Sequence, residues 1–213
     1  MKIHPYMINL LFAFPLLLGT CIASESKSGN AERNIVSDSA KKILIVYLSR
    51  TGNTKAVAEM IHKEMGGNLV SIELEKPYPE NYQAIVKQAA EENESGYLPP
   101  LKTKIDSIQQ YDLIFIGFPT WGMQLPPPMK SFLKQYDLSG NTIVPFNTNA
   151  GYGIGNSFET IKTMCPNSKI LEGFSTKGGI ERDGIYYVMN GEKEVQTRGE
   201  VNKWLRKIKL NIN

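Results

Sequence analysis

The stretch Ile43-Leu-Ile-Val-Tyr-Leu-Ser-Arg-Thr-Gly-Asn-Thr54 sets the fold class of this 213-residue chain. Its first half, residues 43–48, is a continuous run of apolar side chains, which is typical of a strand buried on both faces of a sheet. Its second half is polar and contains a glycine, and apolar residues at helical spacing follow it up to Met65. The stretch therefore predicts a buried strand, a tight turn and a helix.

The same alternation continues along the chain. We expect further strands at residues 69–74, 112–117, 142–146 and 170–174, and further helices at residues 79–92, 126–136, 157–165 and 193–209. Alternation of this kind builds a parallel sheet with helices on both faces. The expected fold class is α/β, a doubly wound sandwich with a five-stranded parallel sheet.

One connection is longer than the others. Residues 177–192 exceed a normal link between a strand and a helix. The run Ile185-Tyr-Tyr-Val-Met189 is followed by Asn190-Gly191, a dipeptide that favours tight turns. This pattern predicts a small hairpin inserted before the last helix.

The N-terminus has the pattern of a signal peptide over residues 1–23. Lys2 precedes an apolar run, and small residues follow that run up to Ala23. The run is shorter than the roughly 20 apolar residues that a membrane-spanning helix needs. Cleavage before Ser24 would release a free protein, whereas Leu-Gly-Thr-Cys21 resembles a bacterial lipoprotein box and would place a lipid on Cys21. Both alternatives, cleavage before Ser24 and lipidation of Cys21, predict an extracytoplasmic bacterial protein, either periplasmic or anchored to a membrane.

Composition bounds the domain organisation and the class of partner. Residues 24–41 are rich in Ser, Asn, Lys and Glu, which predicts a flexible linker before a folded domain at residues 42–213. The formal net charge is +3 and no Lys/Arg block occurs, so no nucleic-acid partner is expected. Of the two Cys and two His, Cys21 and His4 precede the predicted folded domain, which leaves one Cys and one His, too few for a four-ligand zinc site, and no metal site is predicted. Cys165 is expected to pack in the core.

In a sheet of this kind, ligands bind beyond the carboxyl ends of the strands. The loop after the first strand brings hydroxyls at residues 49, 51 and 54 around Gly52 at the start of a helix. A helix N-terminus favours an anion, so this loop predicts a phosphate site. The Walker pattern is absent, and a monophosphate is therefore expected. An ordinary helix cap is the alternative.

The loop after the 112–117 strand carries apolar side chains where water is expected. Its candidate residues are Pro119, Thr120, Trp121, Gly122 and Met123. A flat aromatic ligand would explain a Trp and a Met at this place. The alternative is a Trp that folds onto the helix below.

The loop after the 142–146 strand is rich in glycine and amides. Its candidate residues are Asn147, Thr148, Asn149, Gly151, Tyr152 and Gly153. The glycines allow the backbone to approach a ligand closely, and Tyr152 supplies another ring. The alternative is an ordinary surface loop.

Together the three loops describe a pocket for a phosphorylated planar ring, and here the chain resembles the flavodoxin family, in particular its bacterial flavodoxin-like subgroup. The resemblance is carried by Tyr47-Leu-Ser-Arg-Thr-Gly-Asn-Thr54, Phe118-Pro-Thr-Trp-Gly122, Asp137-Leu-Ser-Gly140 and Ile143-Val-Pro-Phe-Asn-Thr-Asn-Ala-Gly-Tyr-Gly153. It covers roughly residues 43–210. It implies a flavodoxin-like fold and non-covalently bound FMN.

The resemblance also implies roles for single residues. The FMN phosphate would be held by Ser49, Thr51, Gly52, Asn53 and Thr54, with Arg50 nearby. Trp121 would lie against the isoalloxazine ring, Tyr152 would cover another part of it, and the amides of residues 147–153 would meet its polar edge. Gly122 would present a carbonyl to the ring.

The leading function is therefore FMN-dependent electron transfer, with no catalytic residue of the chain's own. One alternative is an FMN-dependent NAD(P)H quinone or nitro-compound reductase, in which residues 177–192 shape a substrate mouth or a dimer contact. A second alternative is a non-redox module that binds a ligand or a protein. Flavodoxins are commonly acidic, whereas this chain carries +3, so docking to a standard soluble reductase is not expected. The electron donor, the acceptor and the oligomeric state stay open.

Overall fold

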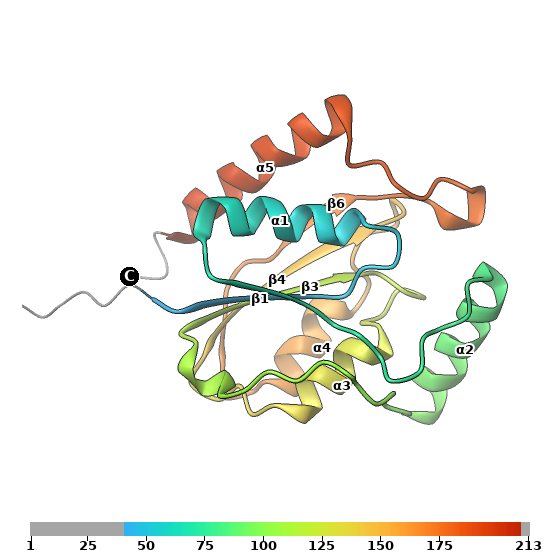
Figure 1. The fold of residues 1–213 in the computed structure, drawn as a ribbon, viewed down its shortest axis with the longest axis horizontal. Coiled ribbons are helices and arrows are strands. Elements are labelled where there is room, and N and C mark those ends of the chain that lie inside the picture. Colours follow the sequence, from blue (N-terminus) through green and yellow to red (C-terminus); the bar gives the residue numbers. More distant parts are fainter. Residues whose placement is uncertain (1–40, 210–213) are drawn as a thin grey trace, which may run out of the picture. The chain divides into compact units, whose positions relative to one another are not determined.

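A computed structural model describes residues 41–209, in which helices pack on both faces of one sheet (Figure 1). The predicted signal peptide and all of the predicted linker except Lys41 lie outside the described residues. The strands are β1 (Ile43–Tyr47), β2 (Asn68–Ser71), β3 (Leu113–Pro119), β4 (Thr142–Asn149), β5 (Lys169–Ile170) and β6 (Phe174–Lys177). All the pairings between these strands are parallel, in agreement with the predicted α/β class.

The strand order is β2-β1-β3-β4-β5, and β6 also pairs with β4. The chain leaves β1 for β2 on one side and then returns to β3 on the other side, so the order reverses between β1 and β3. Ile45 of β1 is in register with Leu69 of β2 and with Phe115 of β3. In doubly wound sheets this reversal opens a crevice at the carboxyl ends of the strands.

The fifth strand differs from the prediction. We expected one strand at residues 170–174, but β5 ends at Ile170 and β6 begins only at Phe174. A methyl group placed on Gly173 would lie 2.4 Å from the ring of Phe158. The chain leaves the ladder where this ring packs against its backbone, and the fifth position of the sheet is shared by two short strands.

Four helices cover the two faces of the sheet (Figure 1). One face packs against α1 (Asn53–Met65) and α5 (Gly191–Lys209), and the other packs against α3 (Pro127–Gln135) and α4 (Ser157–Met164). Alternate residues of β1 serve the two cores, since Ile45 packs with α1 and α5 while Val46 packs with α3 and α4. The predicted double-faced burial of this strand is confirmed.

The remaining helix, α2 (Tyr82–Ser95), lies toward one end of the sheet (Figure 1). Its buried residues are Ile85, Ala89 and Glu92, and none of them belongs to the two main hydrophobic clusters. This helix therefore contributes little to the central core and is free to serve as a wall of the site described below.

The hairpin predicted within residues 177–192 forms only in part, and its turn does not lie at Asn190-Gly191. A short 3-10 helix, Glu181–Asp183, lies in this segment, and one antiparallel bridge joins Ile180 to Ile185 across it. Asn190 accepts a hydrogen bond from the amide of Glu194, and Gly191 begins α5 with φ +51°. The dipeptide that signals a hairpin turn is used here to start a helix. Within residues 41–209, no helix combines the length and the hydropathy that a bilayer crossing requires.

Candidate functional site

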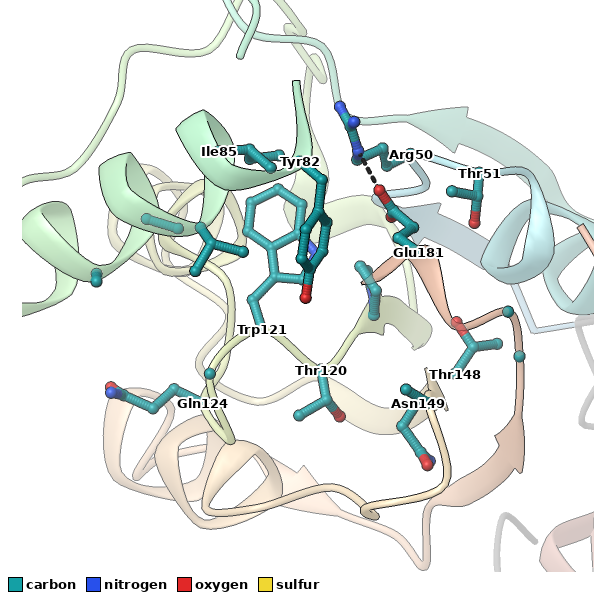
Figure 2. Close-up of a pocket in the computed structure, with 18 of the residues that line it drawn as sticks. Arg50, Thr51, Tyr82, Ile85, Thr120, Trp121, Gln124, Thr148, Asn149 and Glu181 are labelled. Atoms are coloured by element: carbon teal, nitrogen blue, oxygen red, sulfur yellow. Dashed lines mark hydrogen bonds and ion pairs between the residues drawn. The ribbon is translucent and has the colours of Figure 1, made fainter. Parts of the chain in front are cut away.

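A cavity of about 290 Å³ lies at the carboxyl ends of β1, β3 and β4 (Figure 2). Its lining comes from residues that follow these three strands, from one side of α2, and from the start of the segment after β6. The volume is near the lower end of the range found for small-molecule sites. The strand-end position predicted from the sequence is therefore where the structure places a cavity.

The loop after β1 opens the N-terminus of α1 toward this cavity. Gly52 has φ +86°, a left-handed conformation that glycine adopts without strain, and it precedes the first helical residue. The N-cap residue Gly52 has no side chain that could cap the helix, and the first turn holds no acidic residue. The amide N–H groups of residues 51–54 donate no hydrogen bond within residues 41–209. Free amides at the positive end of a helix dipole fit an anionic ligand group.

The side chains of the same loop are mostly engaged with the protein. Ser49 Oγ accepts a hydrogen bond from the amide of Lys55 at 3.2 Å, and Thr54 Oγ1 pairs with Thr148 Oγ1 at 2.8 Å. Thr51 Oγ1 accepts from Asn53 Nδ2 at 2.8 Å, which leaves the Thr51 hydroxyl proton available. Thr51 and Asn53 line the cavity, whereas Ser49, Gly52 and Thr54 do not. The loop offers a ligand its backbone more than its hydroxyls.

Arg50 lines the cavity and is held by three partners. Its Nε donates to Glu181 Oε2 at 2.6 Å, and its two terminal nitrogens donate to the carbonyls of Pro79 at 3.2 Å and Glu80 at 2.5 Å. Figure 2 shows the ion pair beside Thr51. The cation predicted near the phosphate site is therefore neutralised by a carboxylate from the segment after β6.

The loop after β3 presents Trp121 to the cavity. The backbones of Trp121 and Gln124 exchange hydrogen bonds of 3.3 and 3.0 Å, which closes a tight turn around Gly122 and Met123. Both turn residues have positive φ, +56° and +60°. Gly122 lines the cavity with Pro119 and Thr120, but Met123 is exposed and lies outside the lining.

The end of β4 and the loop after it contain both lining and supporting residues. Thr148, Asn149 and Ala150 line the cavity. Asn149 Oδ1 accepts hydrogen bonds from the amides of Gly151 and Gly153 at 2.8 and 3.1 Å, so these two glycines shape the loop. Buried Asn147 donates to the carbonyl of Phe118 at 3.1 Å and to Thr120 Oγ1 at 2.9 Å, and it joins the loops after β3 and β4.

Tyr152 does not face the cavity. Its side chain is 65% exposed, and its hydroxyl lies 3.5 Å from a terminal nitrogen of Arg182. Another tyrosine, Tyr82 at the start of α2, lines the cavity together with Trp121 (Figure 2). The aromatic wall therefore comes from residues 82 and 121.

Sequence reasoning missed two parts of the lining. The side of α2 that faces the cavity contributes Tyr82, Ile85, Val86, Ala89, Ala90, Asn93 and Glu94, and the segment after β6 contributes Gly178, Gly179 and Glu181. The paired glycines directly after the last strand were a usable signal, because they mark a close backbone approach at a strand end. Nothing local in the α2 sequence indicates that this helix covers a cavity. Within residues 41–209, no group of three or more acidic, His or Cys side chains could hold a metal ion.

Residues 42–191 match a protein family described as flavodoxin. The flavodoxin of Synechocystis sp. is 28% identical over 161 residues, which cover 71% of this chain and 80% of the relative. A solved structure of a Bacteroides uniformis protein, described as a flavoprotein, superposes with a TM-score of 0.64 at 25% identity and covers 78% of this chain and 99% of that one. A Lactobacillus acidophilus flavoprotein, solved in complex with FMN, has a TM-score of 0.58 at 24% identity and covers 64% and 93%; its likeness concerns the fold.

Proposed function

The chain belongs to the flavodoxin family, and on this basis we propose that it binds FMN non-covalently in the cavity beyond β1, β3 and β4 and carries electrons through it. The observation that carries the proposal is a cluster of amides at the start of α1 that donate no hydrogen bond within residues 41–209 and lie beside a cavity with an aromatic wall. FMN joins a phosphate monoester to a planar ring, so it needs both features. When bound, FMN would supply the redox chemistry, and the protein would supply binding and orientation.

The phosphate end of the proposed site is built from backbone groups. The amides of residues 51–54 and the hydroxyl of Thr51 would donate to the phosphate oxygens. The dipole of the 13-residue helix α1 adds favourable potential there. Arg50 is already paired with Glu181, so the amides rather than a free cation would hold the anion.

The ring end of the proposed site is aromatic and apolar on one side and polar on the other. Trp121 and Tyr82 would hold the ring, while Thr148 lies where its hydroxyl could meet the polar edge of the ring. The side-chain amide of Asn149 also lines the cavity but is already bonded within the protein. Aromatic side chains stack on flat ligands regardless of the ligand's hydrogen-bonding pattern. The shape and chemistry of the lining therefore fit the proposed cofactor.

A second candidate function is a two-electron reductase of a planar organic acceptor with a nicotinamide donor. One observation favours it: Val86 of α2 lines the cavity although its side chain is 46% exposed. Apolar surface left open beside the proposed ring position could accept a second flat molecule. A reductase of this kind would consume NAD(P)H rapidly with a quinone acceptor, whereas a carrier would not.

The N-terminal sequence supports a further part of the proposal, which is that the chain acts outside the bacterial cytoplasm after export. Cys21 is the candidate lipid acceptor. Expression of the full chain and of its Cys21→Ala variant, followed by separation of membranes from the periplasmic fraction, tests this part. Retention of the parent chain in membranes and release of the variant would support a lipid anchor. Periplasmic recovery of both would support a free protein, and cytoplasmic recovery of both would contradict export.

The experiment that tests cofactor binding is a visible absorption spectrum of the purified protein before and after addition of FMN and desalting. A flavin spectrum that survives desalting is expected. Stepwise reduction would then separate the carrier from the reductase. A colourless protein that takes up no FMN would contradict both redox functions and leave the non-redox binding module.

A further inference from the structure

We propose that Asn93 of α2 binds the ring of the ligand through its side-chain N–H group, and that Lys130 of α3 is the positioning residue that holds the Asn93 amide so that this group faces the cavity. The inference rests on the proposed function and deepens it, because it assigns a specific polar contact to a helix outside the strand-end loops. The ligand group it would meet is a hydrogen-bond acceptor on a planar ring, such as a carbonyl oxygen or a ring nitrogen of a flavin.

Asn93 is a polar residue on a mostly apolar wall. From its middle to its C-terminal end, the side of α2 that lines the cavity consists of Ile85, Val86, Ala89, Ala90, Asn93 and Glu94. The Glu94 side chain is exposed, and an ionised carboxylate accepts hydrogen bonds but donates none. Asn93 is half-buried and is the member of this set whose side chain can donate to a ring acceptor.

Lys130 holds the oxygen of the Asn93 side chain. Lys130 Nζ donates to Asn93 Oδ1 at 2.7 Å. Lys130 is half-buried and does not line the cavity, and within residues 41–209 it has no other hydrogen-bond or ion-pair partner. A protonated lysine donates hydrogen bonds and accepts none, so it faces the amide oxygen and not the amide nitrogen. The Asn93 amide cannot turn over without losing this bond.

The nitrogen of the same amide has no partner in the part of the chain that the structure describes. Asn93 Nδ2 donates no hydrogen bond there, although the residue lines the cavity. Because Oδ1 is turned toward α3, Nδ2 is the group that remains available to a bound ligand. A donor that is already fixed before binding loses little conformational entropy when the ligand arrives.

The rotation of α2 about its own axis is fixed at the neighbouring residue. Glu92 is buried and accepts hydrogen bonds from Tyr78 and, at 2.8 Å, from Gln88. Successive helical residues are about 100° apart around the axis, so Glu92 and Asn93 point in different directions. The bonds of Glu92 on one side of α2 therefore help to keep Asn93 on the cavity side.

The other amide side chains of the lining do not combine these two properties. Asn53 Nδ2 and Asn149 Nδ2 each donate to oxygens of the protein and are not free. Gln124 also lines the cavity, but no hydrogen bond within residues 41–209 fixes which end of its amide faces a ligand. Asn93 is thus the lining amide that is both held in one orientation and free to donate.

A donor to a ring acceptor has two measurable consequences. It raises the affinity for the ring, and it favours the reduced form of a flavin, because the ring acceptors gain electron density on reduction and hydrogen bonds to them tune the cofactor. Loss of the donor should therefore weaken FMN binding and lower the midpoint potential of bound FMN.

The test is a fluorescence titration of the purified, flavin-stripped protein with FMN, together with a potentiometric titration of the loaded protein. Asn93→Asp is the decisive variant, because aspartate keeps the shape of the side chain and the oxygen that Lys130 holds, and loses the N–H group. FMN should bind about tenfold more weakly, the usual effect of one lost hydrogen bond, and the midpoint potential should fall. Lys130→Met should weaken binding in the same direction, and Lys130→Arg, which can still donate, should restore the parent's affinity.

The matched control is Lys134→Met, which removes an exposed positive charge from the same helix and should change neither quantity. Far-ultraviolet circular dichroism checks that each variant is folded. If Asn93→Asp binds FMN as tightly as the parent, the pair merely joins α2 to α3, and the inference is overturned while the proposed function stands. Should Asn93→Asp fail to fold, equal affinities of Lys130→Met and the parent would overturn it in the same way. A parent that binds no flavin at all would instead remove the proposed function.

Discussion

The rings of Tyr78 and Trp121 stand almost perpendicular, with centroids 5.2 Å apart and an interplanar angle of 89°. The Tyr78 hydroxyl donates a short hydrogen bond to the carboxylate of Glu92, which also accepts from Gln88 at 2.8 Å. Glu92 is only 6% exposed. Burial and the bond to Glu92 raise the pKa of Tyr78 above its ordinary value, so the phenol keeps its proton. The Trp121 wall of the cavity is thus supported from behind by a neutral donor bound to α2.

Replacing Tyr78 with Phe should lower the free energy of unfolding by about 1–3 kcal/mol, because the buried Glu92 carboxylate loses a donor. Urea denaturation followed by circular dichroism measures this change. Tyr97→Phe is the control, since Tyr97 is exposed. Equal stabilities of the parent and the Tyr78 variant would show that water replaces the lost hydrogen bond.

Removing either ring of the aromatic wall, Trp121 or Tyr82, should weaken FMN binding. Trp121→Ala and Tyr82→Ala should each cost about 1–3 kcal/mol of binding free energy, the usual worth of an aromatic side chain stacked on a base-like ring. Tyr152→Ala should change the dissociation constant little, because Tyr152 lies outside the cavity lining. Fluorescence titration of the stripped protein with FMN gives the three constants. A large effect at Tyr152 and none at Tyr82 would reverse the assignment of the second ring.

Two glycine substitutions should act in opposite directions on stability. A methyl group on Gly117 of β3 would lie 2.0 Å from the ring of Phe146, so Gly117→Ala should destabilise the fold by about 1–3 kcal/mol. Gly199 of α5 has nothing within 4 Å of the same position, and Gly199→Ala should stabilise it by about 0.5–1 kcal/mol. Thermal unfolding of the two variants measures both. A shift of the melting temperature in the same direction for both would contradict this packing.

Burial raises the pKa of the Cys165 thiol from 9.0 to about 11. The folded chain therefore keeps a proton that the unfolded chain releases near pH 9, and raising the pH from 9 to 11 should favour unfolding. Replacing Cys165 with Ala should remove this part of the alkaline loss of stability. Alkylation with iodoacetamide at pH 8, read at the Cys165 peptide by mass spectrometry, should be slow in the native protein and fast in urea. Fast native alkylation would mean that the thiol is accessible.

Patterns of neighbouring residues in the sequence correctly predicted the elements whose formation depends on those neighbours. The buried strand β1, the glycine turn and helix α1 follow from a continuous apolar run, one residue with positive φ and helical spacing. The cavity position followed from the expected parallel sheet, because parallel strands bring their carboxyl ends together. These features need no knowledge of which distant side chains meet.

Features that depend on distant contacts could not be predicted in this way. The fifth strand is interrupted at residues 171–173, where Phe158 packs on Gly173, and this contact joins segments that are distant in the sequence. Tyr82 lines the cavity because α2 lies beside the strand ends, and its sequence pattern would equally suit a helix over the sheet. Asn53 stays a predicted phosphate ligand through its backbone N–H, but its side-chain amide is bonded to backbone groups more than 130 positions away, which its local sequence does not indicate.

One wall of the cavity is formed by α2, whereas the proposed phosphate end is formed by the start of α1, and the two parts pack separately. The buried residues of α2 lie outside both main hydrophobic clusters. The amides proposed to hold the phosphate, at residues 51–54, lie at the start of α1, a helix that packs in the core. Substitutions at Val86 or Ala90 should therefore change this wall of the cavity without touching the loop after β1. Divergence among relatives of this chain should be concentrated in α2, so that one wall of the cavity changes while the anion-binding end at α1 is kept.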